Sequence, residues 1–111
     1  MTVREIVEKL GLRVLAGEEA LDREVRGGYV ADLLSCVMAG AQPDQLWFTL
    51  QTHLNIVAVA SLADVAAVVI TENAPVSTET VKRATQEGVI LLSSPAPTYE
   101  TMVKLVKLGY S

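Results

Sequence analysis

The sequence predicts a single α/β domain whose mainly parallel sheet is flanked by helices. The second half of the chain alternates short apolar strands with helical segments joined by short connections, which is the order expected of parallel strands. The runs at 65–70 and 89–92 are continuously apolar, as in strands covered on both faces. With 111 residues there is enough chain for one core, so residues 1–111 are assigned to one domain.

The N-terminal third is less regular and predicts a short irregular β region after one helix. Thr2 and Glu5 have capping-box spacing, and Gly11 is a natural stop, so a helix is expected over 3–10. The short elements that follow are expected at residues 12–15 (strand), 18–22 (polar connector) and 24–26 (strand).

A pair of glycines, Gly27 and Gly28, is expected to end the second short strand, because glycine permits close backbone approach and positive φ. From Tyr29 the apolar spacing becomes helical, and Asp32 would lie near the start of this helix, where a carboxylate favours the positive dipole end. Cys36 is the one cysteine, which excludes an internal disulfide. It is expected to be a small buried hydrophobe, with a reactive thiol as the alternative.

A strand over 46–50 and an apolar helix after it form the middle of the chain. Asn55 is the expected N-cap of this helix. Residues 55–62 are so apolar that we expect the helix to be buried on more than one side, either deep in the fold or against another subunit.

Three further elements complete the second half after the strand at 65–70. A helix is expected from Ser77 to Glu87, and a strand over 89–92 follows it. Thr98 is the expected cap of the last helix.

Composition and charge exclude several classes of partner. The net charge is −4 and no run of Lys or Arg occurs, so we expect no nucleic acid and no anionic membrane as a partner. The apolar window 56–70 is 15 residues long, below the roughly 20 residues of a membrane-spanning helix. A cytoplasmic location is expected, because the N-terminus has no signal-type apolar region. Half of the residues are hydrophobic, which favours a homodimer.

Polar residues follow the three strands of the second half and form a candidate ligand site. In open α/β sheets, ligands bind beyond the carboxyl ends of the strands, where helix N-termini favour an anion. The candidate ligand-binding residues are Gly27, Gly28, Asp32, Thr49, Gln51, His53, Asn55, Thr71 and Ser93. The alternative is structural: Thr, Asn and Ser at such positions are also common caps and turn residues.

No catalytic residue, metal site or cofactor is expected. His53 is the one histidine, and no Cys or His partner lies at ligand spacing. Gly27-Gly28 lacks the Gly-Lys-Ser/Thr ending of a phosphate loop and the third glycine of a dinucleotide fingerprint. Glu72 is a lone carboxylate, so paired acid–base chemistry is not indicated.

The chain resembles the small stand-alone DRTGG-domain proteins. The similarity rests on three blocks in order, GGYVADLLS at 27–35, Trp47-x-Thr49, and HLNIVAVA at 53–60. It covers about Leu12 to Gly109. The namesake motif is not intact, because three residues separate Asp22-Arg23 from the glycine pair.

The resemblance implies an accessory or assembly role. DRTGG domains look like the N-terminal domain of HPr kinase/phosphorylase and the regulatory part of some phosphotransacetylases, and they occur between CBS domains in certain pyrophosphatases. Our leading hypothesis is therefore a non-catalytic, homodimeric regulatory or assembly module that senses a small anionic ligand. The alternatives are a nucleotide- or acyl-phosphate-binding protein and a phosphotransferase-type enzyme, although the sequence has no P-loop.

Overall fold

The computed structural model describes residues 1–110 and contains one five-stranded sheet in the spatial order β1-β5-β4-β3-β2. Strands β2 to β5 are parallel, and β1 lies antiparallel to β5 at one edge. The mainly parallel α/β fold predicted from the sequence is confirmed. The strands are β1 (Arg13–Ala16), β2 (Gly27–Val30), β3 (Gln45–Thr49), β4 (Ala67–Ile70) and β5 (Leu91–Ser93).

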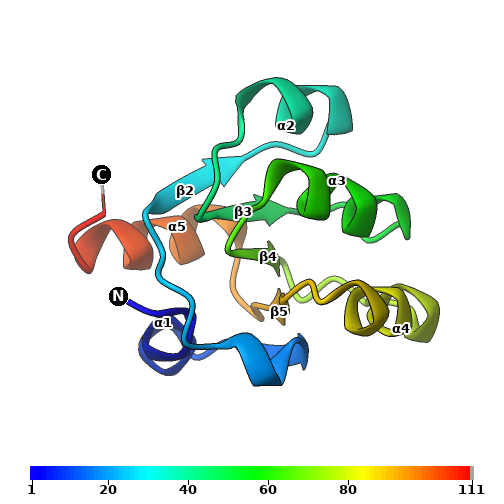
Figure 1. Ribbon diagram of the computed structural model, residues 1–111. Helices are drawn as coiled ribbons and strands as arrows, with labels where there is room; N and C mark the ends of the chain where they lie inside the picture. The colour runs from blue at the N-terminus through cyan, green and yellow to red at the C-terminus, as the bar shows by residue number, and fades with distance from the viewer. Residues whose placement is uncertain (111) are drawn as a thin grey trace.

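Helices cover both faces of the sheet in three layers (Figure 1). Helices α2, α3 and α4 lie on one face, and α1 and α5 lie on the other. The helices are α1 (Val3–Leu10), α2 (Leu34–Gly40), α3 (Asn55–Ala63), α4 (Thr78–Glu87) and α5 (Thr98–Lys107), with a short 3₁₀ helix at Glu18–Ala20.

Two cores, one on each face of the sheet, explain the apolar strands. On β3, Phe48 packs toward α1 and α5, whereas Trp47 packs toward α2, α3 and α4. Both side chains are fully buried, as are Val68 and Val69 on β4. Each large apolar side chain buried in this way stabilises the fold by about 1.5–3 kcal/mol.

Local capping explains several helix boundaries. Thr2 and Glu5 form the predicted capping box of α1: the Glu5 N–H donates to Thr2 Oγ1, and the Thr2 N–H donates to Glu5 Oε1. The Thr2 N–H and the Thr2 hydroxyl both donate to the Glu5 carboxylate, which lowers the pKa of that carboxyl because these bonds stabilise its charged form. Helix α4, predicted from Ser77 to Glu87, begins one residue later, and Ser77 caps it with its Oγ accepting from the Thr80 N–H.

Two predicted caps are wrong. Asn55 and Thr98 are each the first residue of their helix and make no side-chain cap bond. The Asn55 N–H instead donates to Nδ1 of His53, two residues earlier. The Thr98 N–H donates to the carboxylate of Glu72, which follows the neighbouring strand β4. The second cap comes from a remote segment, so local sequence does not reveal it.

The predicted position of the glycine pair, at the end of a strand, is also wrong. The predicted strand at 24–26 is wrong: Glu24 makes an isolated bridge to Thr2, and Gly27-Gly28 open the real strand β2. Pairing with β3 determines this boundary, with Gly27 opposite Gln45. A Cβ atom on Gly28 would lie 3.2 Å from Leu105 of α5, so glycine lets α5 pack closely against β2.

Helix α2 begins later than predicted. Tyr29 and Val30 belong to β2, and the helix starts at Leu34, because pairing with β3 keeps the backbone extended as far as Val30. Cys36 is exposed, so its expected burial is wrong. Its carbonyl oxygen accepts a hydrogen bond from the Tyr29 hydroxyl at 2.9 Å, which ties α2 to β2.

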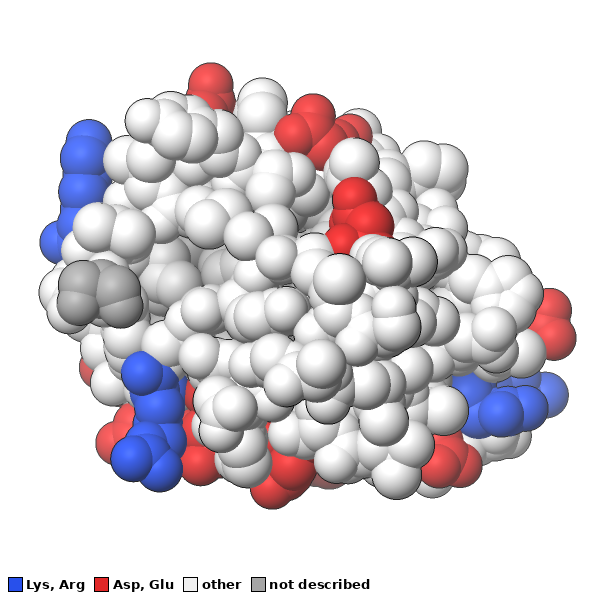
Figure 2. All heavy atoms as spheres, turned by 90° about the horizontal axis from the view of Figure 1, so that it is seen from above, with Lys and Arg blue, Asp and Glu red and all other residues white. Residues whose placement is uncertain are grey.

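Helices α2 and α3 expose large apolar side chains and contain no charged residue. Helix α3 was predicted to be buried on more than one side. Within this chain it buries only one side, with Ile56, Val57 and Ala60, and it exposes Leu62. Viewed from above, charged side chains lie mainly around the rim of the molecule (Figure 2). Within residues 1–110, no helix is long and apolar enough to cross a bilayer.

Candidate functional site

The ends of three parallel strands bring predicted site residues to one edge of the sheet, which we call the carboxyl edge. Because β3, β4 and β5 are neighbours, Thr49, Thr71 and Ser93 follow or end adjacent strands. All three residues are buried. The prediction that these three polar residues lie at the same edge of the sheet is therefore confirmed.

Asp32 joins the loop after β2 to the end of β3. Its Oδ1 accepts from the Thr49 hydroxyl and from the Leu50 N–H, both at 2.8 Å. Asp32 lies near the start of α2 as expected, directly before the N-cap residue Leu33, but it makes no cap bond to the helix. The carboxylate instead stabilises the crossing of two loops.

Paired hydroxyls connect the ends of β4 and β5 to α5. Thr71 Oγ1 bonds to Thr98 Oγ1, and Ser94 Oγ bonds to Thr101 Oγ1 at 2.9 Å. Thr101 also donates to the carbonyl oxygen of Pro97. Sequence analysis did not identify Thr101, although its position one turn after Pro97 makes this bond local. These hydroxyls serve the fold, as the structural alternative anticipated.

Side chains of the loop between β3 and α3 accept hydrogen bonds from backbone N–H groups two residues later. Gln51 Oε1 accepts from the His53 N–H at 3.2 Å, and His53 Nδ1 accepts from the Asn55 N–H at 3.0 Å. A neutral His53 therefore carries its proton on Nε2. The Thr80 hydroxyl of α4 donates to the carbonyl oxygen of Thr52, which fixes this loop against α4.

Two hollows flank the loop that joins β4 to α4. The first, the His53 hollow, has a volume of about 550 Å³ and lies between the β3–α3 loop and the start of α4. Its polar lining includes His53, Ser77 and Glu79. The second, the Arg13 hollow, has a volume of about 280 Å³ and is lined by Arg13, Asn73 and Ser93 together with apolar side chains.

Arg13 was not identified by sequence analysis. It reaches the carboxyl edge because β1 runs antiparallel to β5, which places the first residue of β1 opposite Ser93. No local pattern reveals an antiparallel partner 80 residues away. The glycine pair, in contrast, lies away from this edge, since Gly27 pairs with the first residue of β3.

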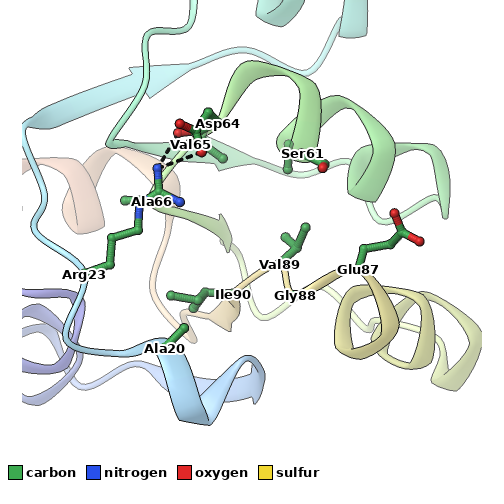
Figure 3. A pocket seen from close by; sticks show the side chains of 11 residues that line it. Ala20, Arg23, Ser61, Asp64, Val65, Ala66, Glu87, Gly88, Val89 and Ile90 are labelled. Carbon is green, nitrogen blue, oxygen red and sulfur yellow. Dashed lines mark hydrogen bonds and ion pairs between the residues drawn. The ribbon is translucent and has the colours of Figure 1, made fainter.

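The opposite edge of the sheet, the amino edge, carries a hollow of about 190 Å³ (Figure 3). Arg23 points toward Asp64 there and donates to its carboxylate at 3.0 Å and its carbonyl oxygen at 2.7 Å. Arg23 also donates twice to Asp44, at 2.9 and 3.1 Å. Two carboxylates therefore neutralise Arg23, and these ion pairs join three segments of the chain at this edge.

Ligand chemistry at the carboxyl edge rests on a small set of side chains. Among residues 1–110, no group of three His, Cys, Asp or Glu side chains is arranged to hold a metal ion. Every fully buried side-chain nitrogen or oxygen of the same residues has a hydrogen-bond partner. The groups that remain free to meet a ligand therefore line the two hollows.

Comparison with known proteins now identifies the family. The DRTGG domain family model matches residues 5–108. No curated protein matches the chain. Among solved structures, a similar one contains the CBS and DRTGG domains of the regulatory region of Clostridium perfringens pyrophosphatase, complexed with its activator diadenosine tetraphosphate. The TM-score is 0.76 at 14% identity, over 95% of this chain and 46% of that chain.

The structural likeness concerns the fold, because the identity is low. This chain spans less than half of the pyrophosphatase regulatory region to which it is similar. The family match, in contrast, covers nearly the whole sequence and confirms the resemblance predicted from the three sequence blocks. The chain belongs to the DRTGG-domain family.

Proposed function

We propose that this chain is a non-catalytic regulatory module that senses a small anionic ligand at the carboxyl edge of its sheet. The observation that carries the proposal is the pair of open hollows at this edge. Thr49 and Thr71 hold neighbouring loops in place, and two hollows remain open on either side of the β4–α4 loop. A ligand in either hollow would contact loops that are tied to β2, β3 and α5.

A nucleotide is the first ligand to test, with acyl phosphates as the alternative. The His53 hollow falls in the size range of small-molecule sites, about 300–1,000 Å³. The Nε2–H of a neutral His53 and the hydroxyl of Ser77 supply hydrogen-bonding groups beside it. The similar pyrophosphatase region was crystallised with an adenine-nucleotide activator, which supports this choice.

Glu79 gives a direct test of the His53 hollow, because its carboxylate lines the hollow and repels an anion. We expect AMP, ATP, phosphate or acetyl phosphate to raise the thermal unfolding temperature in a concentration-dependent way. Glu79→Gln should strengthen binding of a charged ligand there by about two- to fivefold. Glu87→Gln, at the other end of α4, is the matched control. No thermal shift with any of these compounds would contradict ligand sensing.

A phosphotransferase-type enzyme is the least favoured alternative. The Thr49 hydroxyl donates to the Asp32 carboxylate, but Thr49 is 1% exposed, which leaves its oxygen closed to a substrate. Sustained ATP hydrolysis by the purified chain, lost in a Thr49→Val variant, would overturn the non-catalytic assignment.

We also propose that the chain forms a homodimer through the α2–α3 surface, defined here by Leu33, Met38 and Leu62. These side chains are 64%, 51% and 74% exposed and lie on or beside two helices without a charged residue. Large exposed apolar side chains on an uncharged surface are typical of subunit contacts. The surface lies above the sheet face that α2, α3 and α4 cover (Figures 1 and 2).

Light scattering after size exclusion tests the dimer. A Leu62→Glu substitution should convert the dimer to a monomer, because a twofold interface would bury the new charge twice. Val106→Glu is the control, since Val106 is 54% exposed on α5, on the opposite face of the sheet. A wild-type monomer at high concentration would contradict the dimer.

A further inference from the structure

We propose that Arg13, Ser93 and Asn73 form a subsite for a phosphate-type oxyanion, which rests on the proposed ligand-sensing function and locates the charge of the ligand. The three side chains come from β1, from β5 and from the β4–α4 loop, and they line one hollow. No Asp or Glu lines it. The His53 hollow, in contrast, contains Glu79 and no cation.

Arg13 supplies the charge. In the antiparallel pairing of β1 with β5, Arg13 lies directly opposite Ser93. Directly opposed residues project their side chains from the same face of a sheet, within reach of one another. No carboxylate of residues 1–110 lies within ion-pair distance of Arg13, Arg26 or Arg83, whereas Arg4 and Arg23 are both paired. Of the three unpaired arginines, only Arg13 lines this hollow. The Arg13 guanidinium thus keeps its donors for a partner outside the chain.

Ser93 supplies an independent indication of a ligand. The residue is 7% exposed, yet its hydroxyl forms no hydrogen bond with any of residues 1–110, although it lines the hollow. The other hydroxyls of this edge are paired: Thr49 with Asp32, Thr71 with Thr98 and Ser94 with Thr101. Because no fully buried side-chain oxygen of residues 1–110 lacks a partner, the Ser93 hydroxyl must open into the hollow that it lines. An oxyanion in the hollow would accept its proton.

Asn73 completes the donor set. Its own N–H donates to the carbonyl oxygen of Ser94 at 2.9 Å, which holds the β4–α4 loop beside the end of β5. The preceding carboxylate, Glu72, turns away and caps α5. The Asn73 side chain can therefore present its amide to the hollow without a competing negative charge.

The shape of the hollow limits the class of ligand. Its volume, about 280 Å³, suits a single small charged group, and Leu15, Val76 and Val81 give it an apolar wall. Guanidinium, hydroxyl and amide donors together match the several oxygens of a phosphate group better than the two of a carboxylate.

Isothermal titration calorimetry with inorganic phosphate, AMP and acetate tests this subsite. We expect the wild type to bind phosphate and AMP more tightly than acetate. Arg13→Gln should weaken phosphate binding at least tenfold, because it removes the only charge in the subsite. Arg83→Gln is the matched control, since it makes the same charge change at an exposed position of α4. Ser93→Ala should weaken binding severalfold without loss of folding.

The outcomes separate this subsite from the broader function. If AMP binds equally to wild type and Arg13→Gln but binds Glu79→Gln more tightly, the ligand lies in the His53 hollow, and the Arg13 subsite is wrong while ligand sensing stands. If acetate binds as tightly as phosphate, the phosphate assignment is wrong. If the wild type binds none of the three compounds, both the subsite and the anion-sensing function are contradicted.

Discussion

Two arginines at opposite edges of the sheet, Arg23 and Arg13, differ in their partners. At the amino edge, Arg23 lies between two carboxylates and joins the N-terminal connector to the turn before β3 and to the end of α3. At the carboxyl edge, hydroxyls pair with one another, while Arg13 has no carboxylate partner among residues 1–110. The ion pairs of Arg23 with Asp44 and Asp64 therefore stabilise the fold at the amino edge. Arg13 lies beside a hollow at the carboxyl edge, where we propose that a ligand binds.

The largest expected effect concerns the two arginines. Arg23→Ala should lower the free energy of unfolding by about 1.5–3 kcal/mol, because Asp44 and Asp64 lose a charged donor that they share. Both aspartates have positive φ, so Arg23 also stabilises two unfavourable backbone conformations. Arg13→Ala should change the unfolding free energy by less than about 0.5 kcal/mol. Urea denaturation of both variants measures the difference, and equal losses would remove the contrast between the edges.

A smaller effect distinguishes two adjacent serines at the carboxyl edge. Ser94→Ala should destabilise the fold by about 1 kcal/mol, because it removes the bonds of Ser94 Oγ to the buried Thr101 hydroxyl and to the Ala96 N–H. Ser93→Ala should be neutral or slightly stabilising, since the Ser93 hydroxyl has no partner within residues 1–110. Thermal unfolding in phosphate-free buffer gives the comparison. A larger loss in Ser93→Ala would show that its hydroxyl serves the fold rather than a ligand.

The smallest effect is a pH dependence far from both edges. Bonds from Thr2 lower the pKa of Glu5, so its charged form stabilises α1 above its unfolded pKa of about 4.3. This contribution disappears as the pH falls through the lowered folded pKa. The difference in unfolding temperature between the wild type and Glu5→Gln should therefore be present at neutral pH and vanish in acid. A difference that grows on acidification would have the wrong sign.

Sequence patterns predicted the elements that depend on local physics. Helix α1 follows from its capping box, and α4 follows from Ser77 and the spacing of Val81 and Ala84. The buried strands β4 and β5 follow from runs of branched apolar residues. Three of the candidate residues, Thr49, Thr71 and Ser93, meet at one edge because consecutive parallel strands are neighbours.

The features that the sequence did not reveal depend on distant partners. Tyr29 and Val30 have helical apolar spacing, but pairing with β3 places them in a strand. Arg13 reaches the candidate site through an antiparallel partner 80 residues away. Glu72 caps α5 from another loop, which no capping pattern within α5 could indicate.

A map of the ligand on the chain tests the central claim most directly. In a two-dimensional amide NMR spectrum, AMP should shift the signals of the carboxyl edge, especially His53, Asn73 and Ser93. Signals of the amino edge, such as those of Ser61 and Gly88, should stay in place. Shifts confined to the amino edge, or no shift at millimolar AMP, would contradict the assignment of ligand sensing to the carboxyl edge.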